Sequence, residues 1–207
     1  MSDYNYLGVP YSLVNFTSER RVSAVTTLSL VDVVNQSAAQ RWRIQLRFVP
    51  EGAGAAALLA DMWARHAADR LRLTMPQLPG VVLAANRTIT IPTVPRVGAS
   101  TIRMRLPAQT TLMAGTFIGF TDPQDAATSE ADYVDKLYQV VTTQSTTNRA
   151  GNRNVQLTPG IVYPPSQNWT VSTCPMPTFH HAPNSNFGQV YNNSTLAAVT
   201  YDLIEEY

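Results

Sequence analysis

Apolar and polar residues alternate without interruption between residues 40 and 48. The apolar members are Trp42, Ile44, Leu46 and Phe48, and the residues between them are Arg41, Arg43, Gln45 and Arg47. A period of two places successive side chains on opposite faces, which is typical of a strand with one buried face. The pattern therefore predicts a half-buried strand with a stripe of arginines on its second face.

A helix and another strand are predicted directly after it. Apolar residues recur at helical spacing within residues 53–69, at Leu58, Leu59, Met62 and Trp63. The Ala-rich composition of this stretch favours a helix. Alternation returns at Leu71-Arg72-Leu73. We expect a short helix that lies on a sheet, followed by a return into that sheet.

The chain before residue 40 predicts a further strand. Residues 1–20 are polar and aromatic and indicate an extended arm. Residues 22–34 are rich in Val and Thr and alternate again, as strands do. Asn35-Gln36-Ser37 is expected to form the turn that leads into the strand of residues 40–48.

Residues 88–175 indicate a second unit made of short strands. Gly, Pro and Asn separate these strands, which is the pattern of a barrel or sandwich. The predicted strands are Thr88–Ile91, Thr101–Leu106, Thr116–Phe120, Lys136–Thr143, Asn154–Leu157 and Trp169–Thr173. An acidic loop is expected at residues 122–135, and a mobile loop rich in Thr, Asn and Gly at residues 144–152.

The C-terminal residues predict a hairpin, with strands at 187–191 and 195–204 around Asn192-Asn193. The last strand alternates so regularly that it needs a sheet to join. The first sheet is the nearest candidate. The central unit would then be an insertion within a single body, and the fold class is mainly β with one short helix.

Composition narrows the classes of function. Charged residues make up 14% of the chain, well below the roughly 25% of an average globular protein. The sparse charge indicates either a surface covered by partners or an uncharged polar surface. The net charge of +1 gives no field that would gather nucleic acid. No apolar run has the length of a membrane span and no signal peptide opens the chain, so we expect a product of the cytoplasm that stays soluble or leaves by a non-secretory route.

Charge is unevenly distributed along the chain. Residues 176–207 hold three acids, Asp202, Glu205 and Glu206, and no Lys or Arg, whereas residues 1–87 are net basic. The acidic end is expected to sit against the basic first third, within one chain or across a subunit boundary. The candidate interface residues are Arg41, Arg43, Arg47, Glu205 and Glu206. The alternative for the arginines is a solvated strand face.

No constellation of catalytic residues is present. Cys174 is alone, and a lone Cys in a β protein is typically a small buried residue. His180 and His181 are adjacent, so on a strand they would point to opposite faces and chelate poorly. The acidic loop does not match the spacing of a calcium loop. We therefore expect no enzyme activity, no cofactor and no metal.

The order of these elements resembles the distal tail (Dit) proteins of long, flexible-tailed bacteriophages, in the branch with an OB-like second domain. The resemblance rests on two amphipathic strands before a helix, and on an alternating terminal strand. The segments in between that carry it are Arg72-Leu73-Thr74-Met75-Pro76-Gln77, Thr88-Ile89-Thr90-Ile91-Pro92, Ala114-Gly115-Thr116-Phe117-Ile118, Tyr138-Gln139-Val140-Val141-Thr142, Val155-Gln156-Leu157-Thr158-Pro159 and Asn186-Phe187-Gly188. Together they span nearly the whole chain.

The resemblance implies a structural role in a virion. Such proteins form a six-fold ring between the tail tube and the tip apparatus. Residues 1–87 with 178–207 would form the ring domain, and residues 88–177 would form an inserted OB-like barrel that projects outward. The implied partners are other copies of the chain, the tail tube protein and the hub or tip proteins. The polar loop at 144–152 and the Pro-rich segment at 159–165 depart from the family pattern.

Two other functions stay open. An OB-like barrel can bind carbohydrate, and Tyr138, Tyr163 and Trp169 are the candidate sugar contacts for a host-surface glycan. Nucleic-acid binding is disfavoured because the strand that carries Arg103 and Arg105 has no aromatic residue. A small hydrolase using Cys174 or the acidic loop is the remaining alternative.

Overall fold

A computed structural model of the chain shows a mainly β protein, which confirms the expected β class. The structure describes residues 5–6, 9–26, 32–49, 57, 71–75, 81–82, 88–122, 133–134, 136–182, 188–192 and 195–206. The predicted helix at residues 53–69 lies outside these residues, apart from Ala57, which is helical. Most of the predicted acidic loop also lies outside them.

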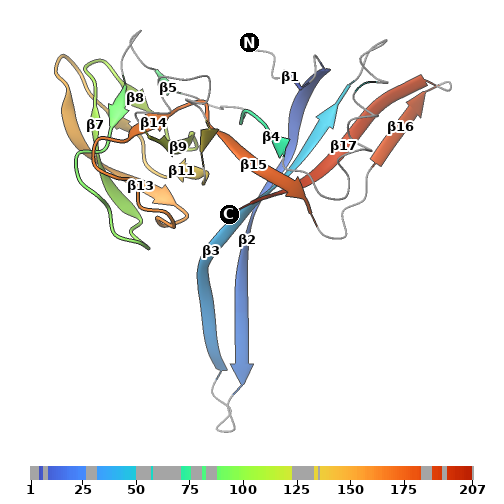
Figure 1. The fold of residues 1–207 in the computed structure, drawn as a ribbon, viewed down its shortest axis with the longest axis horizontal. Helices are drawn as coiled ribbons and strands as arrows, with labels where there is room; N and C mark the ends of the chain where they lie inside the picture. The colour runs from blue at the N-terminus through green and yellow to red at the C-terminus, as the bar shows by residue number, and fades with distance from the viewer. Residues whose placement is uncertain are drawn as a thin grey trace.

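Both ends of the chain contribute to one large sheet (Figure 1). Its strand order is β1-β2-β3-β17-β15-β10, with β16 paired to β17 and β4 paired to β15. The strands are β1 (Asn5–Tyr6), β2 (Val9–Thr26), β3 (Asp32–Phe48), β4 (Leu71–Arg72), β10 (Tyr133–Val134), β15 (Met176–His181), β16 (Gly188–Asn192) and β17 (Thr195–Glu205). The pairing of β16 with β17 confirms the predicted C-terminal hairpin.

β2 and β3 form a long antiparallel hairpin whose far half extends away from the rest of the chain (Figure 1). Their register continues as far as Thr26 opposite Asp32, so the connection falls within residues 27–31. Residues 9–20, which were expected to form an arm, are part of β2.

The predicted turn at Asn35-Gln36-Ser37 is wrong. Asn35 pairs with Ser23, and Gln36 pairs with Val22, inside the β2–β3 ladder. The neighbouring strand supplies the backbone hydrogen bonds that a local turn would otherwise provide, so the turn preference of Asn is overridden.

The C-terminal strand lies beside the N-terminal sheet. β17 pairs antiparallel with β3, and Leu203 stands opposite Ile44. This confirms that the end of the chain folds back onto the first sheet. The Met75 N–H donates a hydrogen bond to the Pro175 carbonyl oxygen at 3.1 Å. The chain therefore leaves the large sheet and returns to it at adjacent points, with the barrel strands in between.

The barrel is closed and has six strands in the order β11-β13-β7-β6-β14-β9. The strands are β6 (Ile89–Thr90), β7 (Thr101–Leu106), β9 (Phe117–Thr121), β11 (Tyr138–Val140), β13 (Gly151–Thr158) and β14 (Thr170–Ser172). Each overlaps one of the six strands predicted from the sequence, and β7 has the predicted bounds. The barrel has one strand more than the five of an OB-fold, and each neighbouring pair is antiparallel.

A small sheet in the order β12-β8-β5 accompanies the barrel strands. Its strands are β5 (Val81–Val82), β8 (Thr111–Leu112) and β12 (Gln144–Ser145). The expectation of a mobile loop at 144–152 is wrong at both of its ends. Gln144 and Ser145 pair with β8, and Gly151 and Asn152 belong to β13. Polar composition indicated a loop, but these residues hydrogen-bond to strands that precede them in the chain.

Two buried apolar clusters hold the structure together. The first lies on the large sheet and includes Trp42, Ile44, Leu46, Phe48, Phe179, Tyr201 and Leu203. The second fills the barrel and includes Ile89, Met104, Leu106, Ile118, Tyr138 and Leu157. Phe117 and Leu137 belong to the first cluster, although Phe117 lies on barrel strand β9 and Leu137 directly precedes β11. The barrel is therefore packed against the sheet through apolar contacts.

Candidate assembly surfaces and the junction of sheet and barrel

The arginine stripe lies on the polar face of β3, as its alternation predicted. Trp42, Ile44, Leu46 and Phe48 are buried on the opposite face. Arg41 and Arg43 are partly buried, whereas Arg47 is exposed between Ser12 on β2 and Thr200 on β17. The stripe thus crosses the centre of the large sheet.

Arg43 is held by two carboxylates of its own chain. Its Nε donates a hydrogen bond to Asp202 Oδ1 at 2.8 Å, and its Nη2 bonds to Asp202 Oδ2, which makes the contact bidentate. Its Nη1 lies 3.0 Å from Glu19 Oε1. The hydrogen bonds to Asp202 and then to Glu19 raise the pKa of Arg43 above its usual value. Asp202 belongs to the acidic C-terminal segment and Arg43 to the basic first third of the sequence. At this contact the two segments therefore meet within one chain, which is one of the two arrangements expected from the charge distribution.

Glu205 lies in the interior, where its exposed fraction is 0%. Its carboxylate forms an ion pair with Lys136 and accepts hydrogen bonds from the Leu137 N–H at 2.6 Å and the Trp42 N–H at 3.3 Å. Lys136 Nζ also donates to the Gln40 carbonyl oxygen at 2.6 Å. The site therefore joins β17, β3 and the segment that leads into barrel strand β11.

Burial shifts the pKa values of both Glu205 and Lys136. Loss of hydration raises the pKa of Glu205, while the Lys136 charge opposes that rise. Loss of hydration likewise lowers the pKa of Lys136, against the attraction of Glu205. The ion pair and the hydrogen bonds to Glu205 partly offset the cost of burying the two groups.

The proposed interface role of Glu205 does not fit its position, because a carboxylate with no exposed surface has its partners inside the chain. Glu206 is partly buried, and its N–H donates to the Thr178 carbonyl oxygen at 2.9 Å. Arg47 is therefore the most accessible of the five candidate interface residues.

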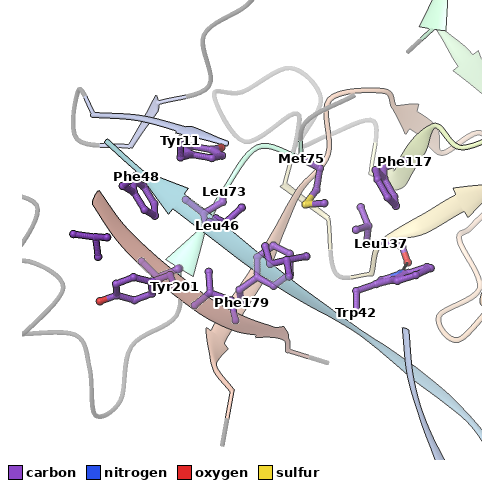
Figure 2. Packing of buried hydrophobic residues seen from close by; sticks show 14 of the residues in the cluster. Tyr11, Trp42, Leu46, Phe48, Leu73, Met75, Phe117, Leu137, Phe179 and Tyr201 are labelled. Atoms are coloured by element: carbon purple, nitrogen blue, oxygen red, sulfur yellow. Dashed lines mark hydrogen bonds between the residues drawn. The ribbon is translucent and has the colours of Figure 1, made fainter. Parts of the chain in front are cut away.

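An aromatic cluster forms the second part of the junction. The rings of Phe16 and Trp42 are stacked with centroids 4.5 Å apart, and Phe117 from β9 lies 4.5 Å from Phe16. Trp42 Nε1 donates a hydrogen bond to the Leu137 carbonyl oxygen at 2.8 Å. Figure 2 shows Phe117 and Leu137 beside Trp42 at one end of the sheet cluster. The indole thus contacts the barrel segment through both its ring and its N–H.

A glycine allows β10 to approach the barrel. A Cβ added at Gly119 of β9 would overlap the side chain of Val134 on β10. β10 also pairs with β15 of the large sheet. Because Gly119 has no side chain, β10 can pack closely against barrel strand β9 while it pairs with β15 of the large sheet.

The three candidate sugar contacts lie in different environments. Tyr138 is buried in the barrel cluster, and its hydroxyl oxygen accepts hydrogen bonds from the N–H groups of Val162 and Tyr163. Its burial raises the pKa of Tyr138 to about 12. Trp169 is partly buried against the same cluster, and of the three candidates only Tyr163, at 45%, is exposed. A sugar contact by Tyr138 does not fit this placement.

The residues that were considered for metal binding and catalysis lie apart or outside the described part of the chain. Among the described residues, no group of three His, Cys, Asp or Glu could hold a metal ion. Cys174 is exposed, contrary to the expectation of a buried thiol. His180 and His181 are successive residues of β15, and Asp122 is the one acid of the predicted acidic loop that is described. Within the same residues, no helix is long and apolar enough to cross a membrane.

Lys136 is the residue of this buried ion pair that the sequence did not reveal. It is the only lysine of the chain and is followed by Leu137 and Tyr138, which are both buried. A single lysine followed by two apolar residues was the sequence feature that could have indicated a buried lysine. Its partner Glu205 is 69 residues away, so the pairing itself could not be read from local spacing.

The fold and these sites define a β protein in which a closed barrel is packed against a sheet that carries a projecting hairpin. The chain contains a buried ion pair between the sheet and the barrel and exposed polar strand faces, and its described part holds no group of residues suited to a metal ion. In comparisons with family models and with curated proteins, no match to this sequence was found.

Proposed function

We propose that this chain is a ring-forming structural protein of a phage tail, placed where the tail tube meets the tip. The observation that carries the proposal is the pairing of β17 with β3, which makes one sheet-based body out of both chain ends. This is the arrangement implied by the resemblance to distal tail proteins, with residues 1–87 and 178–207 as the ring domain and residues 88–177 as the outer domain. The closed barrel takes the place of the OB-like domain in this proposal.

The long hairpin offers a means of assembly. β1 pairs with β2 only near Val9 and Pro10, and β17 pairs with β3 only from Arg43 to Phe48. Among the described residues, the far half of the hairpin therefore has two strand edges without a neighbouring strand. An open edge presents backbone N–H and C=O groups that pair readily with another chain. Sheet-edge pairing between copies is the proposed mechanism, and no chemical step is required.

The partners follow from this role. Six copies of the chain would form the ring, with the tail tube protein on one side and hub or tip proteins on the other. The proposed location is the tail tip of the virion, after synthesis in the host cytoplasm. No cofactor, metal or nucleic-acid sequence is part of the proposal.

The mass of the purified full-length chain in solution tests the proposal. Light scattering should report a multiple of 22.7 kDa that corresponds to a ring. Arg47→Glu should reduce the ring fraction if the exposed part of the stripe contributes to assembly, whereas Arg96→Glu in an exposed barrel loop is the matched charge control. A ring that forms normally with Arg47→Glu would assign the stripe to a solvated face. A wild-type chain that stays monomeric at high concentration would contradict the ring.

Carbohydrate binding is the second candidate, and the exposure of Tyr163 is the observation that favours it. An exposed aromatic ring can stack on a sugar face. Glycan-array binding by the full-length protein, lost in Tyr163→Ala, would support a role in host-surface adhesion. An array without signal would remove this alternative.

A further inference from the structure

The outer surface of barrel strands β7 and β13 is polar and carries two arginines. Arg103 and Arg105 are exposed on β7 and alternate with buried apolar residues. Asn154 lies opposite Arg103 in the antiparallel ladder, and Asn152 lies opposite Arg105. Residues that stand opposite each other in such a ladder project to the same side of the sheet. With the exposed pair that precedes them in the ladder, they form what we call the β7–β13 face: Thr101, Arg103, Arg105, Asn152, Asn154 and Gln156.

The β7–β13 face has no carboxylate of its own. No Asp or Glu occurs in residues 88–121 or 136–182, whereas the same residues contain five Arg. Among the residues that the structure describes, Arg103 and Arg105 form no ion pair, although Arg43 and Lys136 do. A surface with two exposed guanidinium groups and no acid attracts anions and repels cations. The partner that complements this face is therefore negatively charged.

The β7–β13 face lies on the side of the barrel away from the large sheet. In the closed strand order, β7 is three strands from β9 in both directions, so these two strands lie on opposite sides of the barrel. β9 carries Phe117, whose ring packs edge-on against Trp42 of the large sheet. Asp122, the one described acid between residues 88 and 182, directly follows β9. Figure 1 likewise shows β7 and β13 at the outer side of the barrel, where another molecule can reach them.

The side chains of the face indicate the type of anion. A guanidinium group donates two parallel hydrogen bonds to the oxygens of one phosphate or carboxylate. Residues two apart on a strand project in the same direction, about 7 Å from each other, so Arg103 and Arg105 can hold two successive anionic groups of one extended chain. The amides of Asn152, Asn154 and Gln156 can donate and accept hydrogen bonds with hydroxyl groups. The face therefore matches a linear polymer in which anionic groups alternate with hydroxylated units.

Nucleic acid fits this face less well than a polymer without bases. Single-stranded nucleic acid is bound through aromatic side chains on which its bases stack, and neither β7 nor β13 contains Phe, Tyr or Trp. Both charged residues of the face are arginine, whose planar fork matches the geometry of phosphate. We propose that the β7–β13 face binds a linear polyol phosphate, a polymer of hydroxylated units joined by phosphodiester groups. The inference goes beyond the proposed ring role and is independent of it, because one chain carries the whole face.

Calorimetric titration of the full-length protein with a synthetic glycerol phosphate oligomer, at several salt concentrations, tests the proposal. The affinity should fall as salt rises, because neutralised phosphates release their counterions. Arg103→Ala/Arg105→Ala should weaken binding about tenfold or more and lower the slope of log K against log salt by about two, one for each arginine. Arg103→Lys/Arg105→Lys should keep the salt slope but bind more weakly than wild type, because lysine retains the charge and lacks the planar fork.

Three further variants separate the face from the rest of the barrel. Arg96→Ala/Arg149→Ala removes the same charge from exposed loops and should bind with an affinity close to that of wild type. Tyr163→Ala should also bind normally, since Tyr163 is not part of the face. Asn154→Ala should weaken binding without a change in the salt slope, because it removes a hydrogen-bonding group and no charge. Melting temperatures close to that of wild type establish that the variants are folded.

The possible outcomes decide between the face and other sites. Absence of binding by wild type would overturn the proposal. Equal weakening in the β7 variant and the loop variant would also overturn it, because the charge of the whole barrel would then hold the polymer. Tighter binding of a single-stranded oligothymidylate would identify a nucleic-acid site instead, and tighter binding of an oligogalacturonate would identify a carboxylate site. Light scattering of the same samples reports the ring separately, so a monomeric wild type that binds the oligomer would contradict the ring and support this proposal.

Discussion

The carboxylate of Glu205 connects β17, β3 and the segment before β11. Its contribution to the free energy of unfolding depends on Lys136. Lys136→Met leaves a buried charge without its counter-ion, which typically costs about 3–5 kcal/mol of unfolding free energy. Urea unfolding at pH 7 measures this loss. The double variant Lys136→Met/Glu205→Gln should lose less, because no buried charge remains. Equal losses in the single and double variants would show that the ion pair is not what stabilises the junction.

Acid should relieve the defect of Lys136→Met. Burial already raises the pKa of Glu205 above its usual 4.5, and removal of the lysine charge raises that pKa further. When the pKa of a carboxyl group is higher in the folded protein than in the unfolded chain, the unfolding free energy falls as the pH rises from 4.5 toward the folded pKa. In that range the group ionises in the unfolded chain but stays protonated in the folded protein. The difference in unfolding free energy between wild type and Lys136→Met should therefore shrink from pH 7 to pH 5. A constant difference would contradict the assigned cause.

Tyr138 provides an alkaline counterpart in the barrel. Its hydroxyl ionises near pH 10.0 when unfolded, and burial raises the folded pKa to about 12. Stability is complete below pH 10 and is lost as the pH rises toward 12, by roughly 2–3 kcal/mol for this group. Tyr138→Phe lacks the ionisable group, so its unfolding free energy should fall less over this range. Parallel curves for the two proteins would mean that Tyr138 is not the group responsible.

Strand β10 depends on the absence of a side chain at position 119 of β9. Gly119→Ala places a methyl group into the volume of Val134, and such overpacking typically costs about 1–3 kcal/mol. We expect a lower melting temperature and faster hydrogen exchange at Tyr133 and Val134, because β10 must move away from the barrel. The double variant Gly119→Ala/Val134→Ala should recover part of the loss. No recovery would indicate that the clash is relieved elsewhere.

The body and the barrel should unfold together. Phe117 and Leu137 belong to the cluster of the large sheet, and Lys136 is bound to Glu205, so neither part keeps its buried surface when the other unfolds. Calorimetry of the wild-type chain should therefore show one transition with equal calorimetric and van't Hoff enthalpies. Phe117→Ala should weaken the coupling and broaden the transition. Two separate transitions in the wild-type chain would show that the junction does not couple the parts.

The sequence predicted elements best where a strand has its own alternation. Thr101–Leu106 was predicted with the observed bounds because its exposed and buried positions alternate without a break. The turn at 35–37 was misplaced because Asn35 and Gln36 are held by strand β2, which local preferences do not reveal. The junction could not be predicted, since Trp42, Lys136 and Glu205 are brought together only when β17 pairs with β3 and the barrel is packed against the sheet.

Electron microscopy of the purified full-length chain tests the proposed function most directly. The account predicts closed rings with six-fold symmetry, each subunit carrying a barrel attached to a sheet-based body. The absence of rings from the images, together with a light-scattering mass of 22.7 kDa at every concentration measured, would contradict it.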